Sequence, residues 1–319
     1  MTTVIKNWAI PAVILLILVT FPFYTSGYIL SLLLIVFMYA ALAVSWIIFS
    51  GYTGYINLGV AAFFGLGTYV AVELWPRLPF PALIVLGGVV SGFFALLIGF
   101  PCLRIRGPYF IILTLGLSEL VKSLVERYEV QVRHSLGTIL LDTPSAEAQY
   151  YSLLGITVAA VIVAHVIRNS RFGLGLLSIK GNEDAAEVMG VNTTKYKLLS
   201  FALSAAFMGC VGTVMALRWT FIEPVIAFNP LITFQVTIMA TLGGVEDFRG
   251  PLLGAALLTL ISEVLGLQFV YHYLIILGTT LILVIRFLPS GIMGTLRRLR
   301  MGRRNVAQYK KFKEEKLPH

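Results

Sequence analysis

The chain has 319 residues, of which 58% are hydrophobic and only 12% are charged, and its mean hydropathy is +0.89. Soluble domains carry about 25% charged residues, so a water-soluble enzyme or binding module is excluded. Disorder is excluded as well, because a disordered chain is poor in apolar residues. Much of the formal net charge of +9 lies in residues 297–316, beside an apolar segment. A cytoplasmic flank explains this basic stretch better than nucleic-acid binding does.

About 20 apolar residues form a helix long enough to cross a bilayer. Ten stretches approach this length, which predicts an all-α polytopic membrane protein with about ten transmembrane helices. The third stretch is rich in glycine and the eighth is short. We expect a transmembrane domain over residues 1–296 and a basic cytoplasmic tail over 297–319. The predicted spans are 8–24, 27–49, 54–74, 81–102, 108–126, 150–168, 197–219, 230–244, 251–270 and 271–288.

The distribution of basic residues predicts the orientation of the chain. If the N-terminus is cytoplasmic, ten spans return the C-terminus to the cytoplasm. Most of the 24 lysines and arginines then lie on the inner side, as the positive-inside rule requires. The inverted orientation would place most of them outside. The basic residues left on the outer side are Arg77, Lys122, Arg127, Arg133 and Arg218.

Motifs that bind nucleotides or carry catalysis are absent from the sequence. There is no phosphate-binding G-x-x-x-x-G-K-[S/T] loop and no serine nucleophile elbow, and the four histidines show no metal-ligand spacing. The two cysteines, Cys102 and Cys210, fall in apolar runs and are expected to be buried thiols. We therefore expect a non-catalytic chain with no cofactor or metal of its own. A transporter, a channel or a membrane scaffold remains.

The inner loop over residues 169–196 contains a predicted short helix. Asn182 is a favourable N-cap, Glu183 and Asp184 place acids in the first turn, and Gly190 is a typical stop. A simple connector between two spans would show the same pattern. The residues alone leave that interpretation open.

Polar groups inside spans are functional candidates, because they are costly in a bilayer. Glu119, Lys122 and Glu126 share one face of the fifth span, and we expect them to neutralise one another at its outer end. Glu263 is expected to hydrogen-bond to a neighbouring helix. Asn57, among the glycines of the third span, is a candidate for lining a solute pathway, and so is Glu119.

The inner loop resembles the cytoplasmic E-A-A-x-x-x-G loop of ABC importer permeases, because Asp184, Ala185 and Ala186 are followed by three residues and Gly190. Further blocks, in the same order along most of the chain, resemble the branched-chain amino-acid ABC transporter permease family, and within it the M-type subunit. The blocks are GYTGYINLGVAAFFGLGTYVA (51–71), LRIRGPYFIILTLGLSE (103–119), VNTTKYKLLSFALSAAFMGCVGT (191–213), GGVEDFRGPLLGAALLTLISEVL (243–265) and FLPSGIMG (287–294).

The resemblance implies a multi-pass subunit of an ABC importer in the bacterial or archaeal cytoplasmic (inner) membrane. Its partners would be an H-type permease subunit, two ATPase subunits and an extracytoplasmic solute-binding protein, with ATP and Mg bound on the ATPases. The short inner helix would dock on an ATPase and transmit its motion to the spans. The residues assigned to this coupling are Glu183, Asp184, Ala185, Ala186 and Gly190.

The implied cargo is a branched-chain or other amino acid, and two alternatives stay open. Tyr55 and Asn57 stand where the family usually has Gln and Ser, and the family also includes permeases for urea and small carboxylated solutes. An ion-coupled secondary carrier, with Glu119 and Glu263 as ion sites, is a rival of a different class. Such a carrier has no use for an ATPase-docking helix.

Overall fold

The computed structural model describes residues 16–24, 27–75, 77–134, 136–268, 278–279 and 291–295. This part of the chain is almost wholly helical, with one pair of two-residue strands. The elements in chain order are η1 (Phe21–Tyr24), α2 (Gly27–Trp46), η2 (Ile47–Gly51), α3 (Val60–Leu74), α4 (Phe80–Cys102), α5 (Pro108–Tyr128), η3 (Glu129–Arg133), β1 (Thr138–Ile139), α6 (Ala146–Arg168), α7 (Arg171–Gly181), α8 (Glu183–Val188), α9 (Thr193–Trp219), β2 (Phe221–Ile222), α10 (Pro224–Ala227), α11 (Pro230–Gly243) and α12 (Arg249–Gln268).

Six helical segments of the described chain are long and apolar enough to cross a membrane. The predicted third span is shorter than expected, because α3 has 15 residues and covers only about 22 Å. Of the predicted span 8–24, residues 8–15 lie outside the described residues, and the predicted span 271–288 lies outside them except for residues 278–279. The six segments are Gly27–Gly51, Phe80–Cys102, Pro108–Arg133, Ala146–Arg168, Thr193–Trp219 and Pro224–Gly243.

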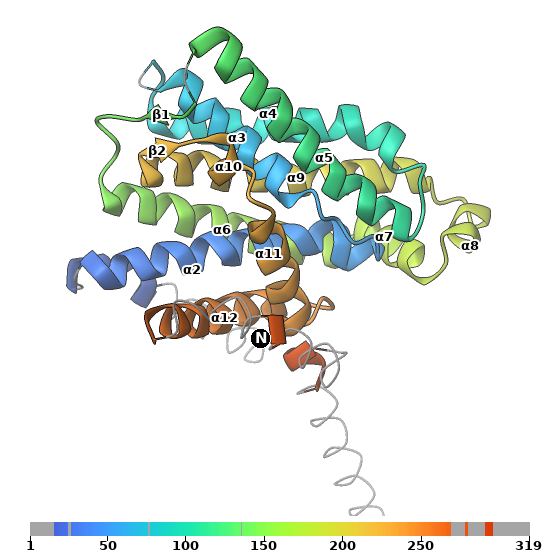
Figure 1. Ribbon diagram of the computed structural model, residues 1–319. Helices are drawn as coiled ribbons and strands as arrows, with labels where there is room; N and C mark the ends of the chain where they lie inside the picture. Colours follow the sequence, from blue (N-terminus) through green and yellow to red (C-terminus); the bar gives the residue numbers. More distant parts are fainter. Residues whose placement is uncertain are drawn as a thin grey trace, which may run out of the picture.

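The long helices form a bundle with two distinct ends (Figure 1). α7 and α8 lie at one end, which we call the α8 end. At the opposite end, which we call the strand end, β1 pairs with β2 in antiparallel register, with Thr138 opposite Ile222. α12 packs on α2 and α11, whereas α5 packs on α3, α4 and α10.

Glycines allow α3, α4 and α9 to approach one another closely. A Cβ atom on Gly67 of α3 would lie 2.0 Å from the carbonyl oxygen of Gly209 on α9, and one on Gly212 would lie 1.9 Å from that of Phe64. The Thr213 hydroxyl adds a hydrogen bond to the Gly67 carbonyl at 2.9 Å. Helices in lipid associate through such close packing and interhelical hydrogen bonds, because lipid tails give no hydrophobic drive.

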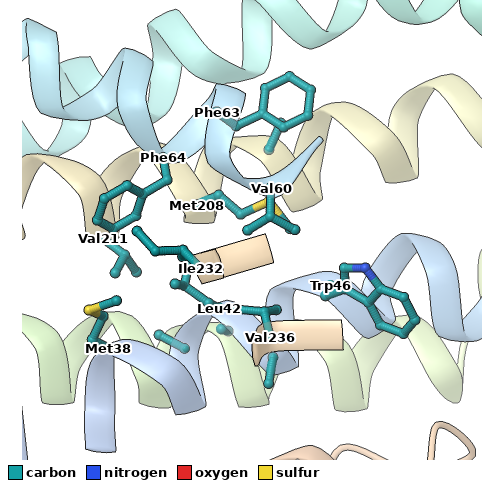
Figure 2. Close-up of a cluster of buried hydrophobic side chains, with 14 of the residues drawn as sticks. Met38, Leu42, Trp46, Val60, Phe63, Phe64, Met208, Val211, Ile232 and Val236 are labelled. Carbon is teal, nitrogen blue, oxygen red and sulfur yellow. The ribbon is translucent and has the colours of Figure 1, made fainter. Parts of the chain in front are cut away.

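The apolar core lies where α2, α3, α9 and α11 meet. Figure 2 shows side chains from these four helices converging on one another. Trp46, Phe63 and Phe64 are among its large members, and none is more than 2% exposed. This core holds the short helix α3 inside the bundle rather than at its surface.

The chain between α2 and α3 departs from regular helix, which corrects the predicted start of the third span at residue 54. The π-helical turn η2 ends α2, and residues 54–59 are non-helical. Lipid offers no hydrogen bonds to such backbone, so the protein must supply them. Thr114 on α5 accepts from the Leu58 amide at 3.0 Å, and Trp46 Nε1 donates to the Asn57 carbonyl at 2.8 Å.

We expect Gly67→Ala to destabilise the protein by about 1–3 kcal/mol, the usual cost of overpacking a tight contact, because the methyl group would meet the Gly209 backbone. The matched control is Gly155→Ala on α6, where a Cβ atom has nothing within 4 Å. Thermal unfolding in detergent should show a lower midpoint for Gly67→Ala alone. Equal midpoints would contradict the close approach of α3 and α9.

Candidate functional site

A short helix, α8, lies between α7 and α9. Asn182 caps it, since the Asn182 side-chain oxygen accepts a hydrogen bond from the Ala185 amide at 3.0 Å. Gly190 follows with φ +88°, a left-handed conformation that favours glycine. The prediction of a short helix that starts after Asn182 and stops at Gly190 is confirmed.

Glu183, the first residue of α8, is bound to three other elements. Lys197 Nζ on α9 lies 2.6 Å from Glu183 Oε1, and the Tyr55 hydroxyl, from the break between α2 and α3, donates to Oε2. Arg106, in the link between α4 and α5, lies 3.7 Å from Glu183 and 2.6 Å from Asp184. The first turn of α8 is therefore fixed to α9, to the break and to the α4–α5 link.

The Lys197 side chain is only 3% exposed. Its ammonium also donates to the Leu103 carbonyl at 3.1 Å and lies 4.7 Å from the centre of the Tyr55 ring. Burying an ammonium group is costly unless it is paired and hydrogen-bonded. Glu183, Leu103 and Tyr55 together meet that requirement.

The electrostatics of Glu183 favour its ionised form. Burial acts to raise the pKa of the carboxyl group, but hydrogen bonds from Lys197 and Tyr55 and the charge of Arg106 outweigh burial and hold the pKa below its ordinary value. A carboxyl group with a depressed folded-state pKa stabilises the fold above its unfolded pKa, and this contribution is lost as the pH falls through the folded value. The ion pair is therefore intact at neutral pH.

Two more contacts connect elements at the α8 end. Lys180 of α7 donates to the Gly51 carbonyl at 2.9 Å, which joins α7 to the π-helical turn. Arg168, the last residue of α6, lies 3.3 Å from Asp247 in the link between α11 and α12. The contacts of Glu183 with Lys197, Tyr55 and Arg106 we call the Glu183 cluster. With the two contacts above, this cluster connects the ends of most helices at the α8 end.

The predicted coupling residues divide into an inward and an outward group. Ala186 is 4% exposed and Glu183 is bound to Lys197, so both face the body of the protein. Asp184, Ala185 and Gly190 are exposed.

The outward surface of α8 is extended by two apolar residues that sequence reasoning did not single out. Val188 is 88% exposed and Met189 is 84% exposed. Apolar side chains held this far into solvent by a capped helix are suited to contact with another protein.

The two predicted pathway residues occupy different environments. Asn57 is 1% exposed, and its side-chain oxygen accepts from the Gly59 amide at 2.8 Å, so it stabilises the break in this conformation. The Glu119 side chain on α5 is 49% exposed and pairs with Lys122 at 3.3 Å. Glu126 forms no ion pair with Lys122 within the described residues, so the expected neutralisation covers two of the three charges.

Glu263 on α12 accepts a hydrogen bond from the Tyr28 hydroxyl on α2 at 3.0 Å. The expected hydrogen bond to a neighbouring helix is confirmed. α12 and α5 lie on opposite sides of the bundle in Figure 1. The structure does not bring Glu119 and Glu263 together.

Sequence reasoning missed Lys197, Tyr55 and Arg106 as partners of α8. One signal was available: Lys197 is a charge at the start of the predicted seventh span, and such a charge needs a partner. Its pairing with Glu183, 14 residues earlier, depends on how the chain turns between α8 and α9.

Comparison with known proteins assigns the sequence to a family. The family described as branched-chain amino acid transport system / permease component matches residues 28–285. The chain belongs to this family. It is a non-catalytic transmembrane permease component of an ABC transport system.

Individual relatives are more distant. The permease is 26% identical to the high-affinity branched-chain amino acid transport system permease protein LivM of Salmonella typhimurium, over 88% of this chain and 73% of that protein. It is 22% identical to a probable branched-chain amino acid transport permease protein LivH of Methanocaldococcus jannaschii, over 75% of this chain and 82% of the relative. The ribose import permease protein RbsC of Haemophilus influenzae is 20% identical over 44% of each chain. No solved structure matches the permease.

We expect Glu183→Gln to destabilise the permease by about 3–5 kcal/mol, because it leaves the buried Lys197 ammonium without its counter-charge. Adding Lys197→Met should recover part of this loss. Asp184→Asn is the matched control, since the Asp184 side chain is 77% exposed. Thermal unfolding in detergent measures all four proteins, and a Glu183→Gln midpoint equal to that of Asp184→Asn would contradict the described pairing.

Proposed function

We propose that the permease moves a small solute, an amino acid with an apolar side chain, inward across the cytoplasmic membrane. It would act with an H-type permease, two ATPase subunits that bind ATP and Mg, and an extracytoplasmic solute-binding protein. The observation that carries this proposal is α8, a capped helix bound to the bundle by Glu183 and presenting Val188 and Met189 to solvent. The names of the LivM and LivH relatives support the solute class and the paired permease.

The α8 end is proposed to be cytoplasmic, because the basic residues of the sequence gather on that side. Residues 8–24 and 271–288 are proposed to add spans, giving ten in all with both termini in the cytoplasm. The strand end would then face the binding protein.

Motion would pass from the ATPase into the membrane through the Glu183 cluster. A displacement of α8 acts on α9 through Lys197, on the break between α2 and α3 through Tyr55, and on the α4–α5 link through Arg106. An irregular, side-chain-supported break inside a bundle is a natural place for spans to change their relative position. Asn57 lies in that break, and exposure of its amide to solute in another conformation remains a proposal.

The ion-coupled carrier has weaker support. Its two candidate sites pair with Lys122 and Tyr28 on opposite sides of the bundle, rather than with each other. An ion-coupled carrier also needs no ATPase-docking helix, so it gives the anchored α8 no function. Urea or a small carboxylate as cargo on the same architecture is the remaining alternative.

Val188→Arg should weaken ATPase binding by about 2 kcal/mol or more, the scale of an interface hot spot, while the permease remains folded. Ala186→Arg should instead destabilise the permease itself, because Ala186 is buried within its own chain. Ile139→Arg is the control for copurification alone, since Ile139 is 66% exposed at the strand end, far from α8. Copurification with the ATPases and solute-stimulated ATP hydrolysis are the measurements.

Wild-type copurification and hydrolysis in Val188→Arg would show that α8 is only a connector. Loss of ATPase copurification in Ile139→Arg would show that the assay reports general damage.

Topology can be tested by cysteine labelling in a background without Cys102 and Cys210. Gly137→Cys should react with an impermeant thiol reagent in intact cells, and Asn182→Cys should react only after the membrane is opened. Both positions lie in or beside exposed links at opposite ends of the bundle. Labelling of Asn182→Cys from outside would overturn the proposed orientation.

A further inference from the structure

α5 is the least buried of the six spans, with 28% of its most apolar stretch inside the protein, compared with 72% for the segment that contains α2. Its exposed surface carries apolar side chains, among them Ile112, Leu120 and Leu124, and beside them a line of small, polar and charged residues. This line consists of Gly116, Glu119, Ser123 and Arg127, which follow one another at helical spacing and are exposed. We call this set the α5 stripe.

The exposed face of α4 carries no charged residue. Val85, Val89, Phe93, Leu97 and Phe100 follow one another along it and are each at least 50% exposed. A face of this kind suits contact with lipid. The α5 stripe does not, because exposed charge within a span is costly and generally faces a protein interior or a water-filled cavity.

The α5 stripe leads into an open cavity of about 670 Å³ at the strand end of the bundle. Charged groups of both signs line it, from Glu126 and Arg127 on α5 and from Glu223 just before α10. Apolar side chains, among them Val130 and Val225, complete the lining. Among the described residues these three charges form no ion pair with one another or with a neighbour.

We propose that this cavity and the α5 stripe form the extracytoplasmic half of the solute path, and that the cavity receives a zwitterionic amino acid with an apolar side chain. The inference rests on the proposed import function and deepens it by naming the site. Arg127 would bind the carboxylate, and Glu126 and Glu223 would bind the ammonium group. Val130 and Val225 would contact the side chain.

The charge pattern distinguishes this solute from its alternatives. A simple carboxylate would leave both acids uncompensated, and a simple amine would leave Arg127 uncompensated. Urea would leave all three charges without a counter-charge. Hydrogen bonds in which one partner is charged are stronger than those between neutral groups. Of the solutes considered, only the zwitterion offers a counter-charge to both the acidic groups and the arginine of the lining.

The path is tested by thiol labelling of the assembled transporter in a background without Cys102 and Cys210. Gly116→Cys and Ser123→Cys should react with a small membrane-impermeant reagent, and Phe93→Cys on the lipid-facing side of α4 should not. L-leucine at high concentration should slow labelling of Ser123→Cys, whereas isovalerate and isopentylamine, which each lack one of its charges, should not. If neither Gly116→Cys nor Ser123→Cys reacts with the reagent, this face of α5 is buried against the partner permease, and the proposal is overturned.

The binding roles are tested by ATP-driven leucine uptake into proteoliposomes that contain the whole transporter. Arg127→Gln and Glu223→Gln should each lower uptake roughly tenfold, the effect of losing one hydrogen bond to a charged group. Arg77→Gln and Glu147→Gln, exposed charges at the same end outside the cavity lining, should leave uptake unchanged. Equal uptake in all four variants would overturn the site, whereas no leucine uptake by the unmodified transporter would overturn the proposed function instead.

Discussion

The architecture of the α8 end depends on one requirement: the ammonium group of Lys197 is nearly inaccessible to water and must be paired. Glu183 supplies the counter-charge, and the Leu103 carbonyl and the Tyr55 hydroxyl complete its surroundings. Meeting this requirement brings four segments distant in sequence to one point. A buried ion pair adds little stability compared with an apolar contact of the same volume. Its value here is geometric, because it holds a short helix that could not maintain its own position.

The packing of the other helices determines how a displacement at the Lys197–Glu183 pair would pass through the bundle. Glycine contacts hold α3, α4 and α9 too close together to slide independently, so α9 can carry a displacement from Lys197 along its 27 residues. The break between α2 and α3 is the contrasting element. Its backbone is bound by side chains rather than by helical hydrogen bonds, and these bonds can exchange without unwinding a helix. In the proposed mechanism α9 is the rigid part and the break is the deformable part, and the two meet at Tyr55.

The sequence predicted those features that depend on local rules. The helical class follows from composition, and the bounds of α8 follow from the cap at Asn182 and the stop at Gly190. The Glu119–Lys122 pair is also local, since it joins residues three apart. Predictions that depended on tertiary placement succeeded less often. Ala186 is suited by its size to a docking surface, yet packing turns it inward and leaves Val188 and Met189 outside.

We expect α8 to move as one body with α4 and α9, and distances measured within the assembled transporter test this most directly. Spin labels at Glu187 on the exposed side of α8 and at Phe93 on α4 would be compared with and without a non-hydrolysable ATP analogue, in a background without Cys102 and Cys210. The account predicts an unchanged distance between the two labels, together with a changed distance between the two copies of α8-type helices in the permease pair. A shift between Glu187 and Phe93 on nucleotide binding would show that α8 moves against α4 and α9, and would contradict the proposed rigid connection.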